Sequence, residues 1–375
     1  MCGTKRKSRS PPASSVNNKL ADANTKEDAA QMEIVWRNVI IMAYIHGAGT
    51  YGLYLWFSGQ MYATTIIIGF IVGYMCSFGV TAGAHRLWAH KCYKAKLPLR
   101  IILAICQTFA CQNSIYEWCR DHRVHHKFTE THADPHNAAR GFFFAHVGWL
   151  LVKKHEDVKI KGKMVDMSDL EADPVVMFQK KYYLPLTIFC SFVVPFLCPL
   201  YFGEEPSKAW YMVVCRYMLI LNFTWLVNSA AHLWGPRPYD NNIHATENAL
   251  VSGLAVGEGW HNYHHVFPWD YKAAELTTYN YNWTTALIDF FAWVGWAYDL
   301  KTVPERIVYQ RVHRTGDGSH PKHNHGVGEV QDGDNGTLCN NNLEVKNSWG
   351  WDDKDVTKEE RGITIILKQD GKKDE

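Results

Sequence analysis

The feature that most constrains this chain is a long segment without charge near its start. Between Asn38 and Ala84 the sequence contains no Asp, Glu, Lys or Arg. A helix that spans a bilayer needs only about 20 apolar residues, so this segment is long enough for two crossings. Residues 58–60 supply a polar turn between them. We therefore predict a hairpin of two membrane helices, near residues 39–57 and 61–83.

Two later segments are also poor in charge. Residues 182–203 contain no charged side chain, and residues 210–232 contain only Arg216. They predict two more membrane helices, which makes four in all. Three prolines in residues 182–203 leave open that the last two helices form the buried core of a soluble domain, although bilayer helices tolerate proline where neighbouring groups satisfy the freed carbonyls.

The basic residues around these helices predict their orientation. The tail before Asn38 is rich in Lys and Arg, the loop at residues 58–60 has neither, and the other short loop adds only Lys208. By the positive-inside rule both ends face the cytosol. We expect residues 1–37 to be a disordered cytosolic tail without a cleavable signal sequence, and residues 317–375 to be a flexible cytosolic tail.

The last four residues, Lys372 to Glu375, have the form of a dilysine retrieval signal for the endoplasmic reticulum. A lysine-rich solvated end is the alternative interpretation.

Composition excludes some classes of protein. The 39 basic and 37 acidic residues nearly balance, which argues against a nucleic acid partner. The 10 cysteines are scattered, with no Cys-x-x-Cys pair. We interpret them as reduced packing residues and expect neither a disulfide framework nor an iron–sulfur centre.

The histidines carry the strongest functional signal. The chain has 19 of them, and many fall into tight groups at predicted cytosolic boundaries. The groups are His85 and His90; His122, His125 and His126; His232; and His261, His264 and His265. On a helix, residues i, i+3 and i+4 share one face, so we expect each trio to converge on a small volume. His85 and His90 lie about 140° apart on an ideal helix, which predicts that they serve two metals or straddle a helix end.

Nine imidazoles without a thiolate suit iron, copper, zinc or nickel, and iron with open coordination positions is the redox-competent choice. Nine nitrogens also exceed the needs of one ion, which leaves room for water, oxygen and the amide of Asn228. A surface histidine cluster is the alternative for one trio alone. Repetition of the groups on one membrane side favours a two-metal site.

Carboxylates near these groups are candidates to accept a hydrogen bond from the outer ring nitrogen of a ligand. The candidates are Glu117, Glu130, Asp134 and Glu258. We favour this role only for Glu258.

At these residues the sequence resembles the membrane-bound acyl-CoA desaturases of the stearoyl-CoA desaturase family, and the insect members in particular. The resemblance runs from about Trp36 to Gly316, and it is most specific in the strings 79–88, 121–137 and 257–271. It implies an all-α integral membrane protein, with a membrane desaturase domain at residues 38–316. Four transmembrane helices would lie under a cytosolic helical cap that holds a histidine-ligated dimetal centre.

The resemblance also implies the ligands and the substrate contacts. Two Fe ions would be held by nine histidines, with Asn228 reaching one ion through a water; the histidines are His85, His90, His122, His125, His126, His232, His261, His264 and His265. Contacts to the acyl-CoA head group fall on Asn38, Asn113, Arg120, Asp121, Lys153, Lys154 and Trp225.

The charges of Arg120, Lys153 and Lys154 suit the phosphates of coenzyme A, although a lysine pair beside a membrane is also typical of an interfacial charge patch. Relatives often have arginine where this chain has Lys153, and lysine cannot make the same bidentate contact.

A second departure concerns the acyl tunnel, where relatives usually place an aromatic residue at the position of Gly73. The tunnel could be longer here. Alternatively, Tyr74 or another helix fills the gap, or Gly73 lets two helices approach closely.

Since no side chain can abstract hydrogen from an unactivated methylene, the metals must supply the chemistry. The resemblance implies an enzyme of the endoplasmic reticulum membrane. It would insert a cis double bond into a long-chain saturated acyl-CoA, using O2 and two electrons from cytochrome b5 and its NADH-dependent reductase. Δ9 on C16 and C18 chains is our best assignment. The alternatives are a Δ11 or other pheromone-type desaturase, a diiron acyl hydroxylase, and a metal-binding or transport protein without catalysis.

Overall fold

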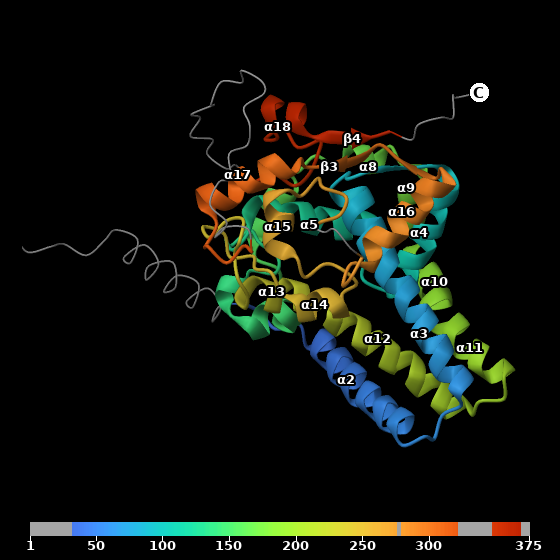
Figure 1. Ribbon diagram of the computed structural model, residues 1–375. Coiled ribbons are helices and arrows are strands. Elements are labelled where there is room, and N and C mark those ends of the chain that lie inside the picture. The colour runs from blue at the N-terminus through green and yellow to red at the C-terminus, as the bar shows by residue number, and fades with distance from the viewer. Residues whose placement is uncertain (1–31, 276–278, 322–346, 369–375) are drawn as a thin grey trace, which may run out of the picture.

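The computed structural model describes residues 32–275, 279–321 and 347–368, and its helices form two halves (Figure 1). Long helices project downward in the view of Figure 1, and shorter helices and strands gather above them. We call these the lower and the upper half. Most of the predicted tail 1–37, much of the predicted tail 317–375 and the dilysine end lie outside the described residues.

The lower half consists of a few long helical stretches. Its elements are α2 (Trp36–Phe57), α3 (Ala63–Phe78), the π-helix η1 (Gly79–Ala89), α10 (Tyr183–Thr187), the π-helix η4 (Ile188–Val193), α11 (Val194–Tyr201), α12 (Pro206–Asn228) and α13 (Ala230–Leu233). Three continuous stretches are long and apolar enough to cross a membrane: Ala63–Ala89, Tyr183–Tyr201 and Pro206–Leu233. They correspond to three of the four predicted membrane helices.

The remaining predicted membrane helix, α2, has 22 residues and packs against α12. It is long enough to cross a bilayer. Glycines, tyrosines and His46 interrupt its apolar sequence, and it is not among the three stretches named above. Its role as a fourth crossing therefore stays a prediction. Large apolar side chains such as Ile40 and Phe57 are exposed along it, as they are on α3 and α11.

The second predicted helix runs further than expected, because η1 continues α3 as far as Ala89. This extension contains His85, and His90 follows its last residue. It packs closely against α4, and a Cβ atom at Gly79 would lie only 2.1 Å from the backbone nitrogen of Gln107. Only glycine permits this approach.

The upper half contains the other helices and all the strands of the described residues. The helices are α4 (Leu97–Ala110), α5 (Ile115–Phe128), η2 (Ala138–Arg140), η3 (Phe144–Gly148), α6 (Trp149–Leu151), α7 (Glu156–Gly162), α8 (Ser168–Glu171), α9 (Pro174–Lys181), α14 (Ala249–Leu254), α15 (His261–Val266), α16 (Trp283–Val294), α17 (Glu305–Thr315) and α18 (Lys358–Ile363). The all-α prediction omitted two small antiparallel sheets. In these, β1 (Lys94–Ala95) pairs with β2 (Ala297–Tyr298), and β3 (Leu300–Thr302) pairs with β4 (Ile365–Leu367).

A core of buried apolar side chains joins several of these helices. It includes Leu103 of α4, Ile115 of α5, Leu170 of α8 and Ile288 of α16. Trp349, from the segment that we expected to be a flexible tail, belongs to the same core and is 3% exposed. Residues 347–368 thus contact the rest of the fold through this tryptophan and through strand β4, and the flexibility of the tail stays a prediction.

Candidate metal centre

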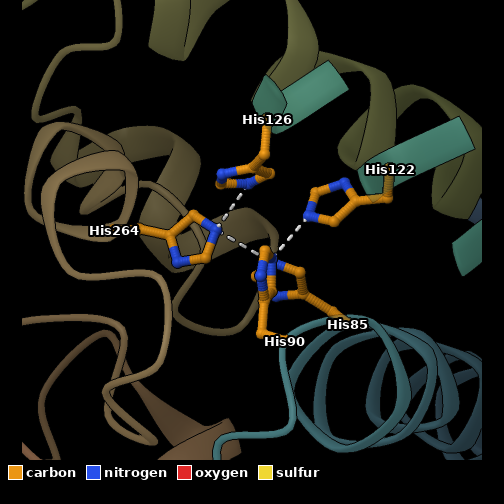
Figure 2. Close-up of side chains that lie close together, drawn as sticks. All are labelled: His85, His90, His122, His126 and His264. Carbon is orange, nitrogen blue, oxygen red and sulfur yellow. Dashed lines mark hydrogen bonds between the residues drawn. The ribbon is translucent and has the colours of Figure 1, made fainter. Parts of the chain in front are cut away.

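The nine histidines singled out from the sequence form two separate groups. The five-histidine group contains His85, His90, His122, His126 and His264, whose rings converge in Figure 2. The four-histidine group contains His125, His232, His261 and His265. Within each group the nearest side-chain nitrogens all lie within 4.8 Å of one another.

Each trio is divided between the two groups, which corrects the expectation that it converges on one volume. His122 and His126 of α5 join the five-histidine group, whereas His125 joins the other. On an ideal helix His122 and His126 point only about 40° apart, whereas His125 is turned about 100° from His126. Each trio therefore reaches two sites at once.

The trio on α15 is divided in the same way, but its i, i+4 pair belongs to the other group. His261 and His265, again an i, i+4 pair, belong to the four-histidine group, and His264 belongs to the other. Helices α5 and α15 thus each contribute to both groups, which fixes the two groups beside each other.

His85 and His90 lie in one group, so the idea that they serve two metals is wrong, and the helix-end alternative holds. His85 lies on the π-helix η1, and His90 follows its last residue. The His90 amide donates to the His85 carbonyl at 3.0 Å, the i to i+5 bond of a π-helix. This wider turn brings residues five apart to one side, which an ideal α-helix does not.

The outer ring nitrogens of four histidines point to oxygen acceptors. His85 Nδ1 lies 2.8 Å from Glu258 Oε2, and His125 Nδ1 lies 2.9 Å from Asp134 Oδ1. His232 Nδ1 lies 2.9 Å from Glu130 Oε1. His90 Nδ1 contacts the main-chain carbonyl of Trp349.

These contacts decide where the imidazole protons lie. An ionised carboxylate and a carbonyl can only accept, so Nδ1 of each histidine must carry the proton. In the neutral form of each ring, the lone pair is then on Nε2. In Figure 2 the Nε2 atoms face one another: His90 and His122 are 2.8 Å apart, and His85 and His264 are 3.0 Å apart. Converging unprotonated nitrogens with their outer protons held by oxygen are the donor set that a divalent metal requires.

Burial keeps most of these rings neutral. Desolvation, followed by repulsion from neighbouring imidazoles, lowers the pKa values of six of them well below the ordinary range; these are His90, His122, His126, His261, His264 and His265. Burial also lowers the pKa of His125, but the Asp134 carboxylate outweighs it and raises that pKa overall. Neutral imidazole is the form that binds metal.

The carboxylates expected beside the ligands divide as follows. Glu258, the one we favoured, contacts His85 and Arg86. Burial would raise its pKa, but Arg86 and His85 hold it at about 2. Glu130 and Asp134, which were candidates that we did not favour, make equivalent contacts with His232 and His125. Glu117 instead accepts from Ser114 at the start of α5.

The residues predicted to contact the acyl-CoA head group lie in several places. Arg120, Asp121 and Lys154 line one cleft of about 700 Å³. Asp121 pairs with Arg120 at 3.1 Å and also with Lys154. Lys153 pairs outside this cleft with Glu33, at 2.6 Å.

The other residues predicted to contact the head group do not line this cleft. Asn38 donates to the Leu150 carbonyl at 2.8 Å, and Asn113 is exposed in the turn after α4. Trp225 is buried on α12 between His46 and His146. Asn228 ends α12, four residues before His232.

The two residues predicted to line the tunnel border a second cavity, of about 180 Å³, in the lower half. Gly73 and Tyr74 line it together with residues of α12 and α14. A Cβ at Gly73 would meet Ile220 at 3.7 Å and Arg216 at 3.9 Å, which is ordinary contact. Close helix approach therefore does not require glycine here.

Comparison with known proteins gives consistent matches. The fatty acid desaturase family matches residues 62–282. An acyl-CoA Delta-9 desaturase of Acheta domesticus is 55% identical over 350 residues, which cover 93% of this chain and 90% of the relative. An acyl-CoA Delta(11) desaturase of Spodoptera littoralis is 55% identical over 290 residues, covering 77% and 86%. Stearoyl-CoA desaturase 2 of Mus musculus is 54% identical over 291 residues, covering 77% and 80%.

Proposed function

The chain belongs to the fatty acid desaturase family, and from that premise we propose that it is an O2-dependent acyl-CoA desaturase. It inserts a cis double bond into a long-chain saturated acyl-CoA. The observation that carries this proposal is the pair of adjacent histidine groups, each with ring nitrogens turned inward. Acyl-CoA desaturases at 54–55% identity supply the substrate class.

Two Fe ions occupy the two histidine groups in this proposal. All nine histidines are ligands, and Asn228 reaches the ion of the four-histidine group through a water, since it ends α12 four residues before His232. Neutral imidazole donors with carboxylate and carbonyl partners behind them support this assignment. Bound iron supplies the redox chemistry with O2 that no side chain can provide.

The overall reaction removes two hydrogens from adjacent methylenes. With two electrons and two protons, O2 is reduced to two waters. Cytochrome b5 and its NADH-dependent reductase supply the electrons. The protein's part is to hold one pair of methylenes against the metal centre, because a positional error of about 1 Å is enough to lose most of the rate.

The substrate head binds at the cleft of Arg120, Asp121 and Lys154. The charges of Arg120 and Lys154 suit the phosphates of coenzyme A, and Asp121 orients these two side chains. Asn38, Asn113, Lys153 and Trp225 complete the head-group contacts in this proposal. The acyl tail extends into the lower half, toward the cavity beside Gly73 and Tyr74.

The protein is a multi-pass protein of the endoplasmic reticulum membrane in this proposal. The four crossings include α2, and residues 38–316 form the desaturase domain. Both termini and the metal centre face the cytosol, as the distribution of Lys and Arg favours. Coenzyme A and cytochrome b5 would then reach the enzyme from the same side.

Δ9 on C16 and C18 chains is our assignment of position. A Δ11 specificity is the alternative that a specific observation favours, since the Delta-9 and Delta(11) relatives are equally identical to this chain. Overall identity therefore does not fix the position of the double bond. The shape of the tunnel does.

The test is to express the chain in a yeast strain that lacks its own desaturase. Lipids are derivatised with dimethyl disulfide, which locates each double bond by mass spectrometry. New alkenes at one position, absent from a His125→Ala strain of equal expression, are the expected result. Hydroxylated acyl chains would instead identify a hydroxylase, and no new product from a well-expressed chain would contradict the proposal.

A further inference from the structure

Residues 347–368, which we call the strap, lie across the upper half of the protein. The strap contains α18 and β4, and β4 pairs with β3 (Figure 1). It lies outside residues 62–282, the part of the chain that matches the desaturase family. Its contacts with the metal centre therefore come from outside the stretch that the family model covers, although the match to the Acheta domesticus Delta-9 desaturase covers 93% of this chain.

The backbone of the strap makes two hydrogen bonds to His90, a residue of the five-histidine group. The Trp349 carbonyl accepts from His90 Nδ1, and the Trp351 amide donates to the His90 carbonyl at 3.0 Å. Gly350 lies between them with φ +153°, and a Cβ there would lie 2.5 Å from the His90 carbonyl oxygen. Glycine is thus the only residue that lets the strap approach His90 this closely.

Side chains anchor the strap beside this contact. The Trp349 ring lies 3.9 Å from the Arg123 guanidinium, and Arg123 also donates to the carbonyl of Ala89, the residue before His90. Asp353 accepts from the Trp349 amide at 2.9 Å and from Lys127 at 2.8 Å. These bonds fix the position of the Trp349 carbonyl, since they hold both its ring and its amide.

We propose that the strap is part of the metal centre, in which Trp349 is a positioning residue for His90. The carbonyl can only accept, so it keeps the proton on Nδ1 and leaves the Nε2 lone pair aimed into the five-histidine group. Carboxylates are the partners of Nδ1 in His85, His125 and His232. The strap supplies the fourth such partner, and it acts on the five-histidine group alone. This inference rests on the proposed metal centre.

The test compares two glycine substitutions in the strap of the full-length protein. Gly350→Ala places a methyl group against the His90 backbone, whereas a Cβ at Gly362 of α18 meets nothing within 4 Å. Gly362→Ala is therefore the matched control. The purified proteins are loaded with iron, the iron is counted, and its loss to a chelator is followed over time.

Loss of an outer hydrogen-bond partner typically lowers metal affinity about 10- to 100-fold. We expect Gly350→Ala to release one of its two ions about 10-fold faster or more, with the second ion released at the wild-type rate. Gly362→Ala should match wild type. Equal acceleration of both ions, or no acceleration, would overturn the proposal. Wild-type protein that binds no metal would instead refute the proposed function.

A second pair of variants keeps the test valid if Gly350→Ala fails to fold. Trp349→Ala removes the ring from Arg123, and Trp349→Phe keeps an aromatic ring there. We expect selective loss of one ion in the alanine variant and recovery in the phenylalanine variant. A lower melting temperature with unchanged release of both ions would assign the strap a structural role only and contradict the proposal.

Discussion

Replacing Glu258 with glutamine removes a buried negative charge that two groups share. Glu258 Oε1 accepts from Arg86 Nε at 3.1 Å and from Nη2 at 2.9 Å, and Oε2 lies 2.8 Å from His85. Arg86 is fully buried, at 0% exposure. With its pKa held at about 2, Glu258 is ionised at neutral pH. Glutamine keeps the shape and leaves the Arg86 charge without its counter-ion.

The expected size of the effect follows from this burial. Breaking a buried ion pair by removing one partner destabilises by about 3–5 kcal/mol. Arg86 keeps other acceptors, including the Tyr271 carbonyl at 2.9 Å, so we expect the lower value, about 3 kcal/mol. At about 2 °C per kcal/mol for a chain of this size, the melting temperature should fall by about 6 °C. Metal affinity of the five-histidine group should also fall, by about 10-fold or more, because His85 loses its charged partner.

The assay is thermal unfolding of the detergent-purified protein, followed by chelator release of iron. Glu156→Gln makes the same chemical change at an exposed ion pair with Lys159, and it should leave both quantities at wild-type values. A Glu258→Gln protein that melts and releases iron like wild type would refute the reasoning, since it would show that neither Arg86 nor His85 depends on this carboxylate.

Two further predictions concern the substrate. Gly73→Leu should fill the cavity of the lower half and reduce conversion of C18 relative to C16 substrate about 10-fold, because overpacking costs about 1–3 kcal/mol. Gly47→Leu is the control, since a Cβ at Gly47 meets nothing within 4 Å. An unchanged ratio of C18 to C16 products in the lipid analysis would contradict the tunnel assignment. Lys154→Met should raise KM for acyl-CoA about 10-fold with kcat unchanged, because a charged hydrogen bond contributes about 1.5–3 kcal/mol. Lys208→Met, in the ion pair at the start of α12, is its control, and equal KM values for the two variants would exclude the cleft as the head-group site.

The sequence predicted the positions of the long helices and the membership of the histidine set, because both depend on local patterns. The near absence of charged residues predicted the three long apolar stretches, and the repeated His-x-x-His-His spacing predicted the trios. It did not predict how the trios divide. That division depends on how α5 and α15 are turned toward each other, which is a property of their packing.

Two other features, the π-helix and the contacts of the strap, were not predicted from the sequence for related reasons. The π-helix that brings His85 and His90 together begins at Gly79, which packs closely on α4, and no local pattern reports this contact. The polar composition of the strap gave no sign of its contacts. Trp349 packs in a core and against an Arg123 side chain far away in sequence. The contact with His90 uses a backbone carbonyl, which every residue has.

The diiron desaturase proposal is tested by incubating purified, iron-loaded protein with reduced cytochrome b5, ¹⁸O2 and stearoyl-CoA. We expect two irons per chain and an unsaturated acyl-CoA without ¹⁸O, with the label in water. We also expect His125→Ala and His264→Ala, one from each histidine group, each to bind less iron and to form no product. An ¹⁸O-labelled acyl chain, or full activity after loss of either group, would contradict the proposal.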